Sequence, residues 1–165
     1  MSIRDQELGP RSDRRQVALG RLWWAAPAAA LVAAVANSGV YLLAQAAGAL
    51  PDDVLVPTAA GERPLGIGEV LFATIIPIIS AAVVLALVAR FARRPLRIFW
   101  TIAMVVLVIS LGAPFSITGA PAEMTAVLLL MHVVAAAVGL PLLTKLVRPN
   151  RDAATESTVR QGASK

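Results

Sequence analysis

The chain contains no cysteine among its 165 residues. That absence excludes disulfides, thiolate metal ligands and cysteine nucleophiles. Histidine occurs once, as His132, and a single imidazole without nearby thiolates or carboxylates cannot complete a metal coordination sphere. We therefore expect neither a metal site nor a cofactor.

Charged side chains are also scarce. They make up 15% of the residues, with a net charge of +5, and they cluster at the ends of long apolar runs. Hydrophobic residues make up 58%, more than the roughly 45–50% of a soluble domain. The basic residues form no aromatic-rich groove, so we expect no nucleic-acid partner. This composition is typical of an integral membrane protein.

Recognisable catalytic patterns are missing from the sequence. There is no GxSxG elbow, phosphate-binding P-loop or HExxH zinc motif, and the apolar runs hold no paired carboxylates. The connections between the runs are short and leave no room for a soluble catalytic domain. We therefore expect that the protein is not an enzyme.

Four apolar runs are long enough to cross a bilayer, which takes about 20 residues of helix. They predict an all-α integral membrane fold, with four transmembrane helices in an antiparallel bundle. The predicted spans are residues 22–47, 69–89, 98–117 and 122–147.

These spans define a membrane domain over residues 21–148. The polar segments 1–20 and 149–165 are expected to be a disordered basic arm and a disordered tail. The first apolar run also admits a secretory signal peptide, because it contains Ala-x-Ala sequences such as residues 34–36. A signal core is usually 7–15 residues long, so we expect this longer run to be retained as a span.

Arginine and lysine are unevenly distributed between the connections. Five lie in the chain up to Arg21, four lie in residues 90–97, and five follow from Lys145 onward, whereas the segment between the first two spans has only Arg63. Cytoplasmic segments of membrane proteins are enriched in these residues. The pattern predicts a multi-pass protein of the bacterial cytoplasmic (inner) membrane with both termini in the cytoplasm.

Three polar residues are expected at the same depth in the membrane. Asn37, Ser80 and His132 each lie about ten residues from the outer end of their span, which places them about 15 Å deep, near the bilayer midplane. Tyr41 and Gln45 continue the helix face of Asn37 toward the outside. These five residues form a candidate polar seam, which Glu69 could extend because it shares a face with Ser80.

The seam has two interpretations. Its members can be hydrogen-bonding partners that hold the helices together. Alternatively, they line a small polar cavity that binds a ligand or passes protons through His132, since ionisable groups inside a membrane are often functional. In either case we expect Asn37 and His132 to face each other or a shared cavity.

Several motifs resemble a family of bacterial, largely actinobacterial, four-helix membrane proteins catalogued as domain of unknown function 6069. They are Trp23-Trp24 before an alanine-rich span, Asn37 and Tyr41 within it, Pro77 in the second span, and the run 131–137 before Pro141. The resemblance covers about residues 20–148 and implies a four-helix integral membrane protein. It implies no activity and assigns no functional residue.

The leading hypothesis is a non-enzymatic integral membrane protein that acts as a structural or accessory subunit. The alternative is a small oligomeric transporter or proton-coupled permeation unit that uses the seam around His132. The expected partners are the lipid bilayer and either further copies of the chain or another membrane protein.

Overall fold

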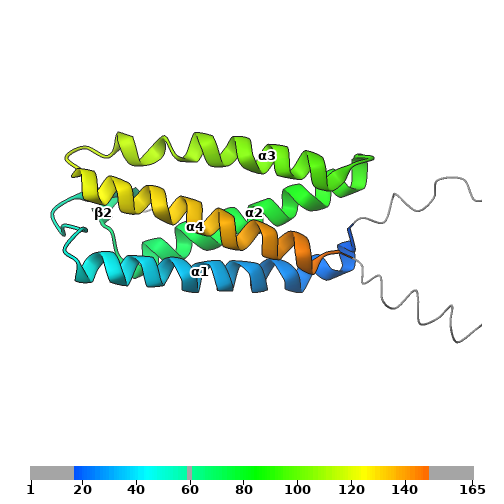
Figure 1. Cartoon of the computed structure of the whole chain (residues 1–165), viewed down its shortest axis with the longest axis horizontal. Helices are drawn as coiled ribbons and strands as arrows, with labels where there is room; N and C mark the ends of the chain where they lie inside the picture. The colour runs from blue at the N-terminus through cyan, green and yellow to red at the C-terminus, as the bar shows by residue number, and fades with distance from the viewer. Residues whose placement is uncertain (1–16, 59–60, 149–165) are drawn as a thin grey trace, which may run out of the picture.

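The computed structural model describes residues 17–58 and 61–148, and this part of the chain folds into a bundle of four long helices (Figure 1). Two short 3-10 helices and a β-hairpin complete it. In chain order the elements are η3 (Leu19–Arg21), α1 (Leu22–Ala46), β1 (Leu55–Thr58), β2 (Gly61–Pro64), α2 (Ile67–Phe91), α3 (Pro95–Ser110), η4 (Ala113–Ser116) and α4 (Ala122–Leu146).

The predicted fold class is confirmed. All four helices are long and apolar enough to cross a membrane when α3 is taken together with η4. Successive helices run in opposite directions, so the bundle is antiparallel (Figure 1). Three helices match the predicted spans to within two residues at each end.

The third helix differs more from its predicted span of 98–117. It begins at Pro95, at the first helical position, where a proline costs nothing because that N–H has no helical partner. It ends at Ser110, and the chain continues through Gly112 into η4. Pro114 accounts for this break, because a proline ring clashes with the carbonyl four residues earlier, here that of Ser110.

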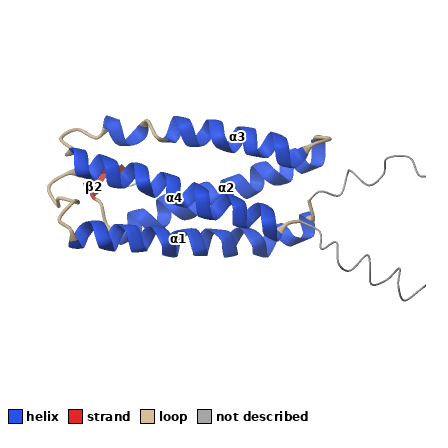
Figure 2. Ribbon diagram, viewed as in Figure 1, coloured by secondary structure: helices blue, strands red, loops and turns tan. Residues whose placement is uncertain are grey.

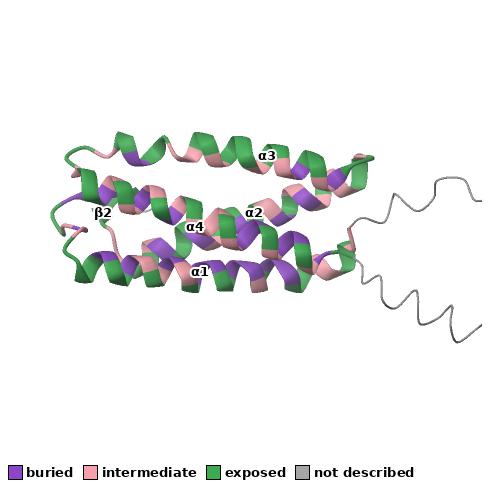
Figure 3. Cartoon of the chain, in the orientation of Figure 1, coloured by how far each residue is buried: buried purple, intermediate pink, exposed green. Residues whose placement is uncertain are grey.

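The helices pack unequally. Helix α1 packs along α2 and α4, and α3 contacts α2 and, to a lesser extent, α4, so α2 and α4 lie between α1 and α3 (Figure 1). The contact face of α1 is a stripe of buried alanines at helical spacing, which allows close approach of neighbouring backbones. Helix α3 is mostly exposed (Figure 3), as a lipid-facing helix would be.

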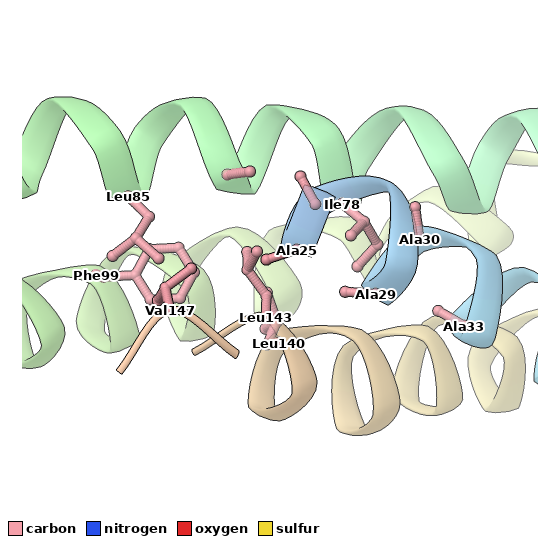
Figure 4. Close-up of a cluster of buried hydrophobic side chains, with 12 residues drawn as sticks. Ala25, Ala29, Ala30, Ala33, Ile78, Leu85, Phe99, Leu140, Leu143 and Val147 are labelled. Carbon is pink, nitrogen blue, oxygen red and sulfur yellow. The ribbon is translucent and has the colours of Figure 1, made fainter. Parts of the chain in front are cut away.

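Two apolar clusters fill the interior. The first lies near the end of the bundle where α1 begins, and Figure 4 shows Leu85, Phe99 and Val147 meeting there. The second lies toward the opposite end and includes Tyr41, Met124 and Met131. We call these the inner and outer clusters, and the ends of the bundle that hold them the inner and outer ends, after the orientation that the sequence predicts.

The first connection holds a β-hairpin that the sequence interpretation did not predict (Figure 2). Strands β1 and β2 are antiparallel, with Val56 opposite Arg63. Gly61 has a φ of 103°, a conformation that favours glycine. Val56 is buried in the outer cluster, together with Leu50 and Val54 of the preceding loop. The connection therefore caps the outer end of the bundle.

The start of α1 is tied to the end of α4. The amide of Ala18 donates to the carbonyl of Val147 at 2.8 Å, and Arg21 Nη1 donates to the carbonyl of Arg148 at 3.2 Å. Val17 packs on the inner cluster, so residues 17–20 belong to the bundle and not to the predicted polar arm. The rest of that arm and the predicted tail lie outside the described residues.

Candidate functional site

A buried polar pair separates the two apolar clusters. Asn37 follows Ala33 of the inner cluster and precedes Tyr41 of the outer cluster, while Thr74 lies between Val70 and Ile78 on α2. Asn37 Nδ2 donates to Thr74 Oγ1 at 2.9 Å, and Thr74 Oγ1 donates to the carbonyl of Val70 at 2.8 Å. The pair joins α1 to α2 halfway along the bundle.

The other amide atom of Asn37 has no partner. Asn37 is 4% exposed, and its Oδ1 is buried without a hydrogen bond to any residue that the structure describes. A buried acceptor in this state costs about 1–3 kcal/mol. Such an atom is unusual in a folded protein, where an ordered water or another donor normally satisfies it.

His132 occupies the corresponding level of α4. Its Nδ1 lies 2.7 Å from the carbonyl oxygen of Leu128, one turn earlier. A carbonyl can only accept, so Nδ1 carries the hydrogen in this contact, and Nε2 of the neutral ring is then an acceptor. Together, Asn37, Thr74 and His132 make a polar layer at the middle of the bundle.

A cavity of about 390 Å³ lies beside this layer, between α3 and the pair α2 and α4. Its walls are mainly apolar and include Phe99, Ala103 and Ala136. Ile102 and Val106 belong to the same walls and are exposed on α3, so the cavity opens sideways at the bundle surface. The polar residues that line it are Asn37, Thr74, Ser80, Ser110 and His132.

A second cavity, of about 590 Å³, lies at the outer end between the hairpin, the start of α2 and η4. Arg63 and Glu69 line it and form a partly exposed ion pair with 3.7 Å between Nη1 and Oε1. His132 and Leu128 line both cavities. The two spaces therefore adjoin at His132, and we call them the mid-bundle cavity and the outer cavity.

Only three of the five predicted seam residues line the mid-bundle cavity. Asn37, Ser80 and His132 all line the mid-bundle cavity. Tyr41 is buried, and its hydroxyl donates to the carbonyl of Leu65 at 3.3 Å, in the segment before α2. Gln45 is exposed and lines neither cavity.

Two details of the expected seam change. Asn37 and His132 share a cavity, but the hydrogen bond of Asn37 goes to Thr74 instead. Ser80, chosen by depth, is exposed and lies six residues beyond Thr74 on α2. Depth along a helix does not determine which side of the helix a residue occupies. Thr74 could have been found from its spacing of four from Val70 and Ile78, which are buried on the same face.

We expect Thr74→Val to lower the free energy of unfolding by about 1 kcal/mol, because it leaves Asn37 Nδ2 buried without an acceptor. Unfolding in mixed micelles titrated with a denaturing detergent measures this change. Thr101→Val is the matched control, because Thr101 is exposed on α3 and its hydroxyl bonds only to the carbonyl of Arg97. Equal losses in the two variants would show that the pair with Asn37 contributes nothing.

Acidic and metal-ligating groups do not gather at the site. Within residues 17–58 and 61–148, no three His, Cys, Asp or Glu side chains lie close enough to hold a metal ion. Glu69 is already paired with Arg63. The site therefore offers hydrogen-bond acceptors and apolar walls, and its chemistry suits binding.

Comparison with known proteins gives a match to a family model. No curated protein and no solved structure matches the chain. A family model described as a family of unknown function, DUF6069, matches residues 17–149, which agrees with the resemblance carried by the sequence motifs. The match spans the whole four-helix bundle, and the chain belongs to this family.

Proposed function

We propose that the protein is a non-enzymatic, multi-pass protein of the cytoplasmic membrane that acts as a structural or accessory subunit. The observation that carries this proposal is the packed inner half of the bundle. Leu85, Phe99, Leu143 and Val147 are each at most 1% exposed, and together they fill the space between the helices on the inner side of the polar layer (Figure 4).

This packing argues against the alternative of a transporter or proton-coupled permeation unit. The outer cavity reaches His132 from the outer end, and the mid-bundle cavity adjoins it there and extends to Phe99 of the inner cluster. This continuity is the feature that favours permeation. A pathway also needs polar groups or water on the other side of the membrane, because a charge in a dry apolar region is costly. The inner cluster supplies apolar side chains there, and the hydroxyl of the buried Thr144 beside it bonds to carbonyls of its own helix, those of Leu140 and Pro141.

The charges at the two ends support the proposed orientation. Among the described residues, all the charged side chains at the inner end are basic: Arg21, Arg90, Arg93, Arg94, Arg97, Lys145 and Arg148. The outer end has Arg63 alone against Asp52, Asp53, Glu62, Glu69 and Glu123. Trp23 and Trp24 are exposed at the start of α1, where aromatic residues meet lipid headgroups.

We expect a reporter active only in the cytoplasm to give signal when it is fused after Lys165 and no signal when it is fused after Gly61. The reason is the enrichment of cytoplasmic segments in arginine and lysine. Fusions after Arg94, in the turn between α2 and α3, serve as an internal control and should give signal. Activity at Gly61 together with silence at Lys165 would reverse the proposed orientation.

The accessory role is tested by two measurements on the full chain. Purification in a mild detergent followed by mass spectrometry should recover a defined membrane-protein partner or further copies of the chain. In sealed vesicles that contain the purified protein, proton and small-solute flux should equal that of empty vesicles. A flux that His132→Phe abolishes would replace the accessory role with the permeation hypothesis.

A further inference from the structure

We propose that the mid-bundle cavity is the binding site of an uncharged amphiphile with hydroxyl groups on its head and one apolar chain, such as a monoacylglycerol. This inference goes beyond the accessory role and holds for any partner of the protein. It rests on the shape of the cavity, the distribution of its polar atoms and the direction of the hydrogen bonds around it.

The first step concerns size and access. The cavity of about 390 Å³ is within the range of roughly 300–1,000 Å³ that is common for small-molecule sites. Ile102 and Val106 on its rim are exposed on α3, in the part of the helix that would face lipid tails. An apolar chain can therefore enter sideways from the bilayer and lie against Ala103 and Ala136.

The second step concerns the kind of hydrogen bond that is missing. Asn37 Oδ1 is a buried acceptor to which none of the described residues donates. In a neutral imidazole whose Nδ1 donates to Leu128, Nε2 of His132 is an acceptor. The hydroxyl of Ser110 donates to the carbonyl of Val106 at 2.8 Å, which leaves its oxygen as an acceptor too. The hydroxyl of Ser80, which also lines the cavity, can donate or accept. A guest that donates hydrogen bonds therefore matches most of the polar lining.

The third step concerns charge. An ammonium group also donates hydrogen bonds, but within residues 17–58 and 61–148 no carboxylate lines the mid-bundle cavity to pair with it, and a buried unpaired charge is costly. Glu69 lines the outer cavity and is paired with Arg63. A head that carries only carbonyl oxygens could accept from the hydroxyl of Ser80, but it would leave the acceptors of Asn37 and His132 without a donor. Neutral hydroxyl groups satisfy both conditions.

The test uses the full chain in lipid nanodiscs and a monoacylglycerol whose acyl chain carries a photoreactive diazirine. Unlabelled 1-oleoylglycerol competes with the probe in one series and methyl oleate, which has the same chain but no hydroxyl, in another. We expect 1-oleoylglycerol to compete about tenfold more strongly, the effect of one or two hydrogen bonds. Mass spectrometry should locate the label on α2, α3 and α4 around the cavity.

Three variants make the result specific to the cavity. Ala103→Leu adds an apolar side chain to the cavity wall and should abolish the labelling, whereas Ala126→Leu, at an exposed position of α4, should leave it unchanged. His132→Phe removes one acceptor and should shrink the advantage of 1-oleoylglycerol several-fold. The first two variants preserve the test if His132→Phe fails to fold.

Four outcomes would overturn the proposal. One is equal competition by methyl oleate and 1-oleoylglycerol. The second is label spread evenly over the exposed faces of the bundle, and the third is unchanged labelling in Ala103→Leu. The fourth is stronger competition by oleylamine than by 1-oleoylglycerol, which would show that the head is a cation.

Discussion

Phe99→Ala is expected to lower the free energy of unfolding by about 3–5 kcal/mol, the usual cost of removing a buried aromatic ring. Phe99 is 1% exposed and lies in the inner cluster between Leu85 and Val147 (Figure 4). Phe99 also lines the mid-bundle cavity, so removal of the ring would enlarge an existing space.

The matched control is Phe115→Ala. Phe115 lies in η4 at the outer end and is 71% exposed, so its removal should change the free energy of unfolding by about 0.5 kcal/mol or less. Reversible unfolding in mixed micelles gives both values under the same conditions. If the two variants lost the same stability, the inner cluster would not be the packed region that the proposed function requires.

Gly139→Leu is expected to have the next largest effect, a loss of about 1–3 kcal/mol from overpacking. A Cβ atom at position 139 would overlap Cδ1 of Ile78 on α2 and touch Cβ of Ala33 on α1 at 3.5 Å. Glycine is needed there because three helices meet without space for a side chain.

Gly39→Leu provides the control for this substitution. Gly39 is exposed on α1, and a Cβ atom added there meets nothing within 4 Å. Leucine also has a higher helix propensity than glycine, so Gly39→Leu should keep or raise the stability. The same micelle titration measures both variants, and a loss at position 39 as large as that at 139 would contradict the close packing of α4 on α1 and α2.

The long helices could be predicted from the sequence because the membrane imposes one simple rule. A run of about 20 apolar residues must satisfy its backbone hydrogen bonds internally, and a helix does so. Short connections cannot cross the bilayer, so each span must return from the side where the previous one ended, and this predicts the antiparallel order. The end of α3 at Ser110 was harder to predict from the sequence. Prolines at positions 27, 77 and 141 lie within helices, whereas Pro114, two residues after Gly112, follows a helix end.

The hairpin could not be predicted by the same reasoning. Residues 55–58 and 61–64 include Pro57 and Pro64 and show no alternation of apolar and polar residues. Their pairing depends on the buried contact of Val56 with the outer cluster. That contact is tertiary, and the local sequence of the two strands does not predict it.

The candidate site could be predicted only in part from the sequence. Depth along the helices, calculated from a constant rise per residue, predicted one level for Asn37 and His132, and both residues line the mid-bundle cavity. It could not separate Thr74 from Ser80, since that choice depends on how α2 is rotated against α1. The free acceptor of Asn37 likewise becomes visible only when the direction of its bond to Thr74 is known.

The polar layer at the middle of the bundle is the central claim, and paired cysteines test it most directly. The chain has no cysteine of its own, so variants with cysteines at positions 37 and 74, or at 37 and 80, carry only the intended pair. After treatment of membranes with a short thiol crosslinker, mass spectrometry of the intact chain should find the 37–74 link in high yield and the 37–80 link at background. Efficient linkage of 37 to 80 with none to 74 would contradict the layer.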